Sequence, residues 1–296
     1  MIERFARFPA YLAERSRSVR LAGDIPALLA HPDWSSPAPV VLWMHGRTAN
    51  KELDPGRYLR WVRAGIAACA IDLPGHGERL EAGMDAPART LDVLERVVAE
   101  IDMVVAALVG RGEVEAVGIG GTPVPRAGVG EVGLAETIRA GLFDTTRMAI
   151  GGMSAGGMAT LRRLCDPHPF RCAAVECTTG ALRTLYFGAG AQWSVKHDPE
   201  RVARIDPSAH LEAWRPIPLL AMHNELDRVV PIAAAMEFVD LLRARYRRAG
   251  ESPDDVEFVV WPESGAPDEH AGFGRHSNDA KNRQLEFLRR HLLPNG

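Results

Sequence analysis

A serine in a glycine-rich stretch is the residue best placed for nucleophilic chemistry. Residues 152–156 read Gly-Met-Ser-Ala-Gly and match the pattern G-x-S-x-G around Ser154. A mainly apolar run at 147–150 precedes the motif and apolar residues at helical spacing follow it, so we expect a sharp turn from a strand into a helix. Glycine is favoured two residues to either side, because side chains there would collide. The turn presents the Ser154 hydroxyl and places the Ala155 N–H at a helix N-terminus, facing a developing oxyanion.

A serine hydroxyl becomes nucleophilic when a neutral imidazole accepts its proton and a carboxylate orients that imidazole. Asp227 follows the apolar run 217–222, and His270 lies in the loop that follows the apolar run 256–260. Ser154, Asp227 and His270 therefore occur in the chain order nucleophile, acid, base, each after a predicted strand. We expect these three side chains to form a catalytic triad.

Both partners of the serine have rivals in the sequence. His276 directly precedes the last predicted helix, whereas His270 lies earlier in a glycine-containing loop and is freer to reach back over the serine. Glu225 and Glu176 are alternative acids, the second at the end of a predicted strand. Asp227 is preferred because it lies where the loop after its strand would present it. The histidines at 45, 76 and 223 are interpreted as turn residues with satisfied hydrogen bonds.

Strands alternating with helices are predicted to position these residues. The eight predicted strands are 18–21, 25–30, 40–44, 66–71, 147–150, 171–177, 217–222 and 256–260, and predicted helices include 2–14, 53–64, 88–109, 134–142, 232–248 and 278–291. This order predicts an α/β fold whose mostly parallel, twisted sheet has helices on both faces. In such sheets reactive groups collect beyond the carboxyl ends of the strands.

The chain is predicted to be a single domain, residues 1–296, with inserted loops at about 110–133 and 178–215. The second insert contains Tyr186, Phe187 and Trp193, which we interpret as a small lid or the wall of an acyl pocket. Packing of the insert against the core is the alternative. Residues 118–121 read Gly-Ile-Gly-Gly without the spacing or the helix of a dinucleotide site, so no cofactor is expected.

Composition excludes several classes of protein. A net charge of −3 over 296 residues offers no basic excess for nucleic acid or an anionic membrane, and no apolar run reaches the length of a membrane span. The N-terminal residues do not resemble a secretory signal, so a cytoplasmic setting is expected. The four cysteines lack zinc-ligand spacing, no metal site is predicted, and Cys69, Cys172 and Cys177 are expected to be buried free thiols. The oligomeric state stays open, a homodimer being one option.

From about residue 16 to its C-terminus the chain resembles the α/β-hydrolase superfamily. It is most similar to the dienelactone hydrolase and prolyl-oligopeptidase-like serine esterases, and the matching pieces are 45–46, 72–77, 152–157 and 223–231. The resemblance implies an α/β-hydrolase fold in which Ser154 is the nucleophile, Asp227 the orienting acid and His270 the base. It also implies an oxyanion hole made by the backbone N–H groups of Arg47 and Ala155, and no cofactor.

The chain departs from the family pattern at two places, near the acid and at the base. The family usually has His-Gly before its acid, where this chain has His223-Asn224, and asparagine tolerates left-handed backbone better than most residues. The catalytic histidine commonly follows glycine, whereas His270 follows Glu269. Dienelactone hydrolases proper use a cysteine nucleophile, so the serine argues against that particular activity.

Arg47 suggests a second role for its side chain. If its backbone N–H faces the oxyanion, its guanidinium lines the mouth of the site and attracts an acyl carboxylate. The alternative is an ion pair between Arg47 and a nearby acid such as Asp54 or Asp72.

The sequence therefore predicts a serine carboxylesterase that hydrolyses a small-to-medium carboxylic ester through an acyl-enzyme. A peptidase of the prolyl-oligopeptidase type is one alternative, although those relatives carry a large additional domain that the short segment before the first predicted strand does not supply. A non-catalytic binding protein with the same fold is the other. An intact set of serine, acid and histidine weighs against it, because a scaffold needs none of the three.

Overall fold

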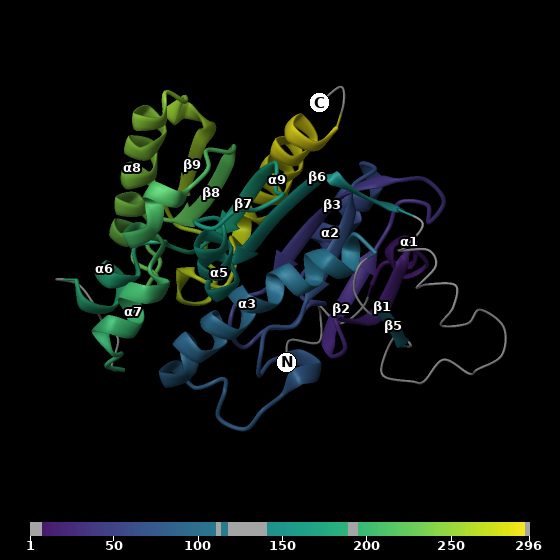
Figure 1. The fold of residues 1–296 in the computed structure, drawn as a ribbon, viewed down its shortest axis with the longest axis horizontal. Coiled ribbons are helices and arrows are strands. Elements are labelled where there is room, and N and C mark those ends of the chain that lie inside the picture. Colours follow the sequence, from purple (N-terminus) through teal and green to yellow (C-terminus); the bar gives the residue numbers. More distant parts are fainter. Residues whose placement is uncertain (1–7, 111–113, 118–140, 189–194, 294–296) are drawn as a thin grey trace.

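The computed structural model describes residues 8–110, 114–117, 141–188 and 195–293. In these residues nine strands form one sheet in the order β5-β1-β2-β4-β3-β6-β7-β8-β9, which runs across the molecule in Figure 1. The strands are β1 (Ser16–Leu21), β2 (Ile25–Ala30), β3 (Ala38–Met44), β4 (Ala67–Ile71), β5 (Val114–Val117), β6 (Phe143–Met153), β7 (Cys172–Glu176), β8 (Leu219–Asn224) and β9 (Val256–Trp261). The helices are α1 (Ala10–Ala13), α2 (Pro55–Arg63), α3 (Thr90–Leu108), α5 (Ala155–Arg163), α6 (Leu182–Phe187), α7 (Pro199–Ile205), α8 (Ile232–Ala249) and α9 (Ser277–Leu292).

The central and carboxyl-terminal strands are parallel. β4, β3, β6, β7, β8 and β9 pair in parallel, while β2 joins β4, and β1 joins both β2 and β5, in antiparallel register. The carboxyl ends of the parallel strands therefore share one edge of the sheet, which is where loops meet in folds of this kind.

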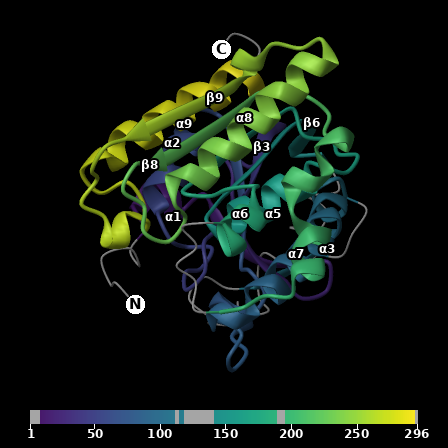
Figure 2. The same cartoon turned by 90° about the vertical axis from the view of Figure 1, so that its left-hand side faces the viewer.

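Helices cover both faces of the sheet, as Figure 2 shows from the β9 end, with α9 and α2 on one side and α8, α5 and α3 on the other. Alternate residues of β3 enter the two cores. Val40 and Leu42 pack in the core beneath α3, α5 and α8, and Val41 and Trp43 pack in the core beneath α2 and α9. A strand buried on both faces must be apolar throughout, which explains its uninterrupted apolar run.

The predicted α/β-hydrolase fold is confirmed, and all eight predicted strands are present. The prediction of an inserted loop at 110–133 is wrong over β5, which adds a ninth strand by pairing antiparallel with β1. A strand of four residues is too short to show a hydrophobic periodicity in the sequence, and β5 forms only by pairing with β1 at the edge of the sheet. Most of the helix expected at 134–142 lies outside the described residues, which resume at 141. Within the helix expected at 2–14, the structure describes α1.

The insert at 178–215 is more regular than the sequence suggested. It contains α6, α7 and a 3-10 helix at Pro207–Ala213. Asp198 caps α7 by accepting the N–H of Glu200, and Asp206 caps the 3-10 helix by accepting the N–H of Ser208, each before a proline at the first helical position. Aspartate followed by proline is a helix-start signal that would have found both helices.

The four cysteines are free and buried, which confirms the expectation for Cys69, Cys172 and Cys177. Among the described residues, no helix combines the length and apolar character that crossing a bilayer requires.

The turn between β6 and α5 packs against the end of β3 with no room for side chains. A Cβ on Gly152 would lie 2.4 Å from the carbonyl carbon of Gly156, and one on Gly156 would lie 2.3 Å from the carbonyl oxygen of Met44. Close approach of backbones is therefore the reason for both glycines of the G-x-S-x-G motif.

We expect Gly156→Ala to lower the free energy of unfolding by about 1–3 kcal/mol, because the added methyl group overpacks this contact. Denaturant unfolding measures the change. Gly56→Ala in α2 is the matched control: its Cβ would meet its nearest neighbours at 3.5 and 3.6 Å, so stability should stay level or rise. Equal stability of the Gly156 variant and the unmodified protein would contradict the close packing.

Candidate active site

Ser154 lies on the turn predicted for it, between the last residue of β6 and the first of α5. Its φ of 52° and ψ of −118° lie where residues other than glycine are strained. Two hydrogen bonds hold this conformation: Ser154 N–H donates to the Glu176 carbonyl at 2.9 Å, and the Thr178 hydroxyl donates to the Ser154 carbonyl at 2.8 Å. The strained turn is thus tied to β7 and the loop that follows it.

The imidazole of His270 lies between Ser154 and Asp227. Its Nδ1 is 2.8 Å from Asp227 Oδ2, and its Nε2 is 2.9 Å from Ser154 Oγ. A carboxylate only accepts hydrogen bonds, so Nδ1 carries the proton and Nε2 is left to accept from the serine hydroxyl. The structure therefore brings together the three residues that the sequence placed in one site.

Asp227 is held by its own loop. Its Oδ1 accepts the N–H groups of Val229 and Val230, each at 2.8 Å, and its side chain is fully buried. His223 Nε2 lies 3.6 Å from Asp227 Oδ2 and donates instead to the Val230 carbonyl at 2.9 Å. Burial lowers the pKa of His223. This histidine is a satisfied turn residue, as its position in the sequence indicated.

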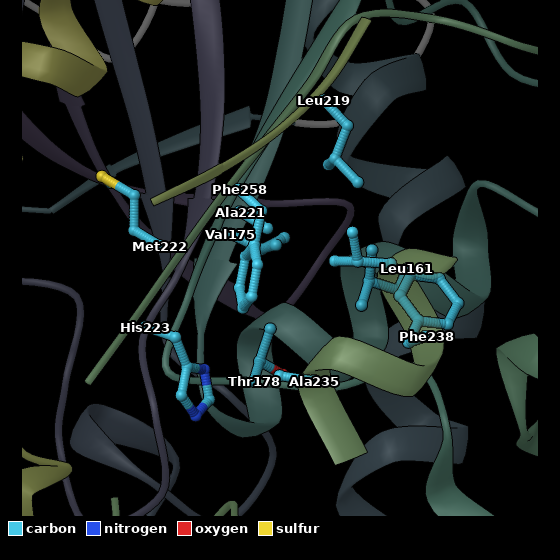
Figure 3. A pocket seen from close by; sticks show the side chains of 11 residues that line it. Leu161, Val175, Thr178, Leu219, Ala221, Met222, His223, Ala235, Phe238 and Phe258 are labelled. Atoms are coloured by element: carbon cyan, nitrogen blue, oxygen red, sulfur yellow. The ribbon is translucent and has the colours of Figure 1, made fainter. Parts of the chain in front are cut away.

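A small cavity beside His223 lies behind this loop, between β8 and α8 (Figure 3). Its volume is about 10 Å³ and apolar side chains such as Leu161, Val175 and Phe238 line it. A void of this size holds one water molecule at most. It is a packing defect and not a substrate site.

The side chains of the three rival residues are placed differently. His276 is half-buried against Trp261, and its Nε2 contacts the Glu263 carbonyl at 3.1 Å. Glu225 is exposed. The carboxylate of Glu176 is occupied by the Arg57 guanidinium, with contacts of 2.5 and 2.8 Å.

The loop after β3 runs past the serine on its other side. A Cβ on Gly46 would lie 3.2 Å from the Cβ of Ser154. His45 fixes the next peptide group: its Nε2 accepts the Leu73 N–H at 3.0 Å, so its Nδ1 carries the proton and donates to the Gly46 carbonyl at 2.6 Å. Because a trans peptide points its C=O and N–H in opposite directions, the Arg47 N–H is directed away from His45.

A buried ion pair ties this loop to the loop after β4. Asp72, which is fully buried, accepts from the Lys51 N–H at 2.8 Å and from Lys51 Nζ at 3.0 Å. Gly77, in the loop after β4, packs directly against this carboxylate. It has a φ of 57°, and a Cβ on it would lie 2.2 Å from the Asp72 carboxyl group. Sequence reasoning did not single out Lys51, and its spacing of 21 residues from Asp72 gave no local signal.

A cleft of about 770 Å³ opens over Ser154 and His270. Its wall includes Trp43, Arg47, Thr90, Met158 and Tyr186. Of the aromatic residues predicted to form a lid or pocket wall, Tyr186 lines this cleft. Phe187 is 42% exposed and does not line the cleft, because successive residues of α6 point about 100° apart. Trp193 lies outside the described residues.

No three side chains of His, Cys, Asp or Glu lie close enough to hold a metal ion in the parts of the chain that the structure describes.

Comparison with known proteins then identifies the family. The model of the prolyl oligopeptidase family matches residues 132–294, more than half of the chain and all of the segment that carries Ser154, Asp227 and His270. The chain belongs to the prolyl oligopeptidase family. As a member of that family it is a serine hydrolase. A comparison with curated proteins gave no match.

Solved structures share the fold of this prolyl oligopeptidase family member. TT1662 from Thermus thermophilus superposes with a TM-score of 0.64 at 22% identity, over 94% of this chain and 99% of that one. A proposed dienelactone hydrolase from Klebsiella pneumoniae has a TM-score of 0.58 at 19% identity, over 92% and 96%. The acylaminoacyl peptidase of Pyrococcus horikoshii has a TM-score of 0.64 at 19% identity, over 94% of this chain, which spans 41% of that protein.

The two departures near the acid and the base form one contact in this family member. The Asn224 amide donates to the carbonyls of Glu269 and Gly272, at 2.7 and 2.9 Å. The Glu269 carboxylate accepts from the N–H and hydroxyl of Ser264 and from the Gly265 N–H, at 2.6–2.7 Å. Glu269 has a φ of 51°, a conformation that suits glycine, and these bonds hold it there. The sequence shows both departures, but it does not show that the Asn224 side chain contacts the loop that contains Glu269.

We expect Asn224→Ala to lower the free energy of unfolding by about 1–3 kcal/mol, because two carbonyl groups lose their donor. It should also lower kcat more than it changes KM, since the loop that carries His270 loosens. Denaturant unfolding and steady-state hydrolysis measure the two effects. Glu225→Gln at the exposed neighbouring position is the control and should change neither. An Asn224 variant with full kcat would show that the loop needs no such tether.

His45 makes stability depend on pH. Burial lowers the pKa of His45 to about 4, well below the value of an unfolded histidine. Between about pH 6.5 and pH 4 the unfolded chain binds this proton and the folded chain does not, so the free energy of unfolding falls as the pH falls. The contribution is at most ~1.4 kcal/mol per pH unit. In His45→Asn we expect a shallower pH dependence in that window, measured by denaturant unfolding; identical slopes would argue against a neutral buried His45.

Proposed function

We propose that the protein is a serine carboxylesterase in which Ser154, His270 and Asp227 act together. One observation carries the proposal: a single imidazole is hydrogen-bonded to the serine hydroxyl at 2.9 Å and to the buried aspartate at 2.8 Å. This is the geometry in which a histidine accepts the serine proton while a carboxylate orients and stabilises the resulting imidazolium.

The proposed reaction has two steps. Ser154 Oγ attacks the ester carbonyl while His270 Nε2 takes its proton. That proton then passes to the alkoxide leaving group as the acyl-enzyme forms. Water, deprotonated by His270, attacks the acyl-enzyme and releases the acid. The N–H groups of Ala155 and Arg47 are the proposed donors to the oxyanion, and loss of one such donor typically costs about 10²–10³ in rate.

The structural likeness to a proposed dienelactone hydrolase supports an ester substrate. Ester hydrolysis also asks less of the site, because an alkoxide leaves more readily than an amine. The cleft of about 770 Å³ is of the size that small organic substrates occupy.

A peptidase is the second candidate, and the family match favours it. The same triad cleaves amides when the histidine protonates the leaving amine. Substrates with matched chromophores separate the two functions.

We expect the protein to hydrolyse p-nitrophenyl esters of short and medium acids at least about a hundredfold faster than it hydrolyses the p-nitroanilides of the same acids and of proline-containing peptides. Ser154→Ala and His270→Gln should each reduce this activity by about 10⁴-fold or more, and Ser154→Ala should abolish labelling by a fluorophosphonate. His276→Gln is the matched histidine control and should retain activity. Faster cleavage of the anilides would make the protein a peptidase, and labelling at a different residue would remove Ser154 as the nucleophile.

A further inference from the structure

Arg47 differs from the other cations that line the cleft. Lys281 is paired with Asp54 at 2.9 Å, and Arg57 is paired with Glu176 at 2.5 Å. Arg47 lies within 4.0 Å of no carboxylate of the described residues: its guanidinium donates at 3.0 Å to the Thr90 hydroxyl and, through its other terminal nitrogen, to the backbone carbonyl of Asp85. The ion pair with Asp54 or Asp72 that the sequence allowed is not formed.

The two neutral acceptors fix the guanidinium without cancelling its charge. The Thr90 hydroxyl donates its own proton to the Pro87 carbonyl at 2.8 Å, so it accepts from Arg47. The Nε–H of Arg47 is buried and has no acceptor among the described residues. Since a guanidinium has five N–H donors, donors remain for a ligand.

Apart from the exposed side chain of Asp85, the residues around Arg47 are neutral or already neutralised. Burial raises the pKa of Tyr186, so this hydroxyl stays protonated, and burial lowers the pKa of His197, so this imidazole stays neutral. His197 packs edge-on against Tyr186 with ring centroids 4.5 Å apart. Arg201 is held by Asp92 and Glu95. Burial lowers the pKa of Arg47 itself by more than the Asp85 carboxylate raises it.

Arg47 directly follows a residue that packs against the proposed nucleophile. That residue is Gly46, and a Cβ added to it would lie 3.9 Å from Ser154 Oγ. Arg47, Ser154 and Ala155 line the same cleft. A substrate with its ester carbonyl at Ser154 and an anionic group at the guanidinium would be fixed at two points, which orients it for attack.

We propose that the cleft selects anionic esters, and that Arg47 binds a carboxylate of the substrate through its guanidinium. This proposal rests on the esterase function proposed above and names its substrate class. A carboxylate is a planar acceptor that matches the guanidinium fork, and the low local dielectric strengthens the pair. The carboxylate belongs to the acyl part or to the alcohol part of the ester, and the two are distinguished by experiment.

Two pairs of esters test the proposal. For the acyl side, p-nitrophenyl hydrogen adipate is compared with its neutral methyl ester. For the alcohol side, the butyrate ester of para-hydroxyphenylpropanoic acid is compared with that of its methyl ester. In one of the two pairs we expect kcat/KM of the unmodified protein to be higher for the anionic member, and this preference to shrink as salt is raised.

In Arg47→Met the anionic member of that pair should lose about 10- to 100-fold more kcat/KM than the neutral member, the value of a charge-assisted hydrogen bond. Arg47→Lys should recover part of the preference. The backbone N–H remains in both variants, so the oxyanion hole is not the variable. Arg201→Met is the matched control: it removes an arginine that is already neutralised and should affect both members of each pair alike. Unfolding midpoints of all variants report whether the contact of Arg47 with Thr90 is needed for folding.

Equal losses on the anionic and neutral members of both pairs would overturn the proposal and leave Arg47 as a tether for the segment that carries Thr90. That result is distinct from failure of the esterase function, in which the unmodified protein hydrolyses none of the four esters.

Discussion

The hydrogen bonds of one imidazole constrain three loops at once. His270, Ser154 and Asp227 come from the loops after β9, β6 and β8, and the two contacts that join them are 2.9 and 2.8 Å long. Hydrogen bonds weaken steeply with distance and angle, so each loop has little freedom. The parallel sheet supplies most of the convergence by ending these strands at one edge. The strained backbone of Ser154 and Glu269 supplies the rest, at about 1–3 kcal/mol for each such residue, offset by the hydrogen bonds around them.

The acidic side chains Asp72 and Glu176, near the cleft, each form an ion pair with a basic side chain. Asp72 is matched by Lys51, and Glu176 by Arg57. A buried charge left without a partner is costly, so these pairs hold loops from different strands in register. Arg47 is held by neutral acceptors instead, which positions its guanidinium and leaves its charge to act on whatever enters the cleft.

The order of strands and helices could be predicted because it is written in local patterns. The apolar run of β3 indicates burial on both faces, and the glycines around Ser154 indicate a tight turn, each within a few residues. Two short elements were missed. β5 has four residues and forms through its pairing with β1. The start of α7 is indicated by Asp198 and the proline that follows it, but this local signal was not used. Short elements in an insert lack the apolar periodicity on which the longer ones were recognised.

For the site, the sequence by itself determined the residue types, the chain order of serine, acid and histidine, and their places after strands of a parallel sheet. The tertiary structure alone decided which histidine reaches Ser154, that Asn224 holds the backbone of Glu269, and that Arg47 forms no ion pair with an acid in the part of the chain that the structure describes. The reason is physical. Strand and helix patterns repeat over a few residues, whereas a side-chain contact between loops depends on the path of both loops, and that path is set by packing across the whole sheet.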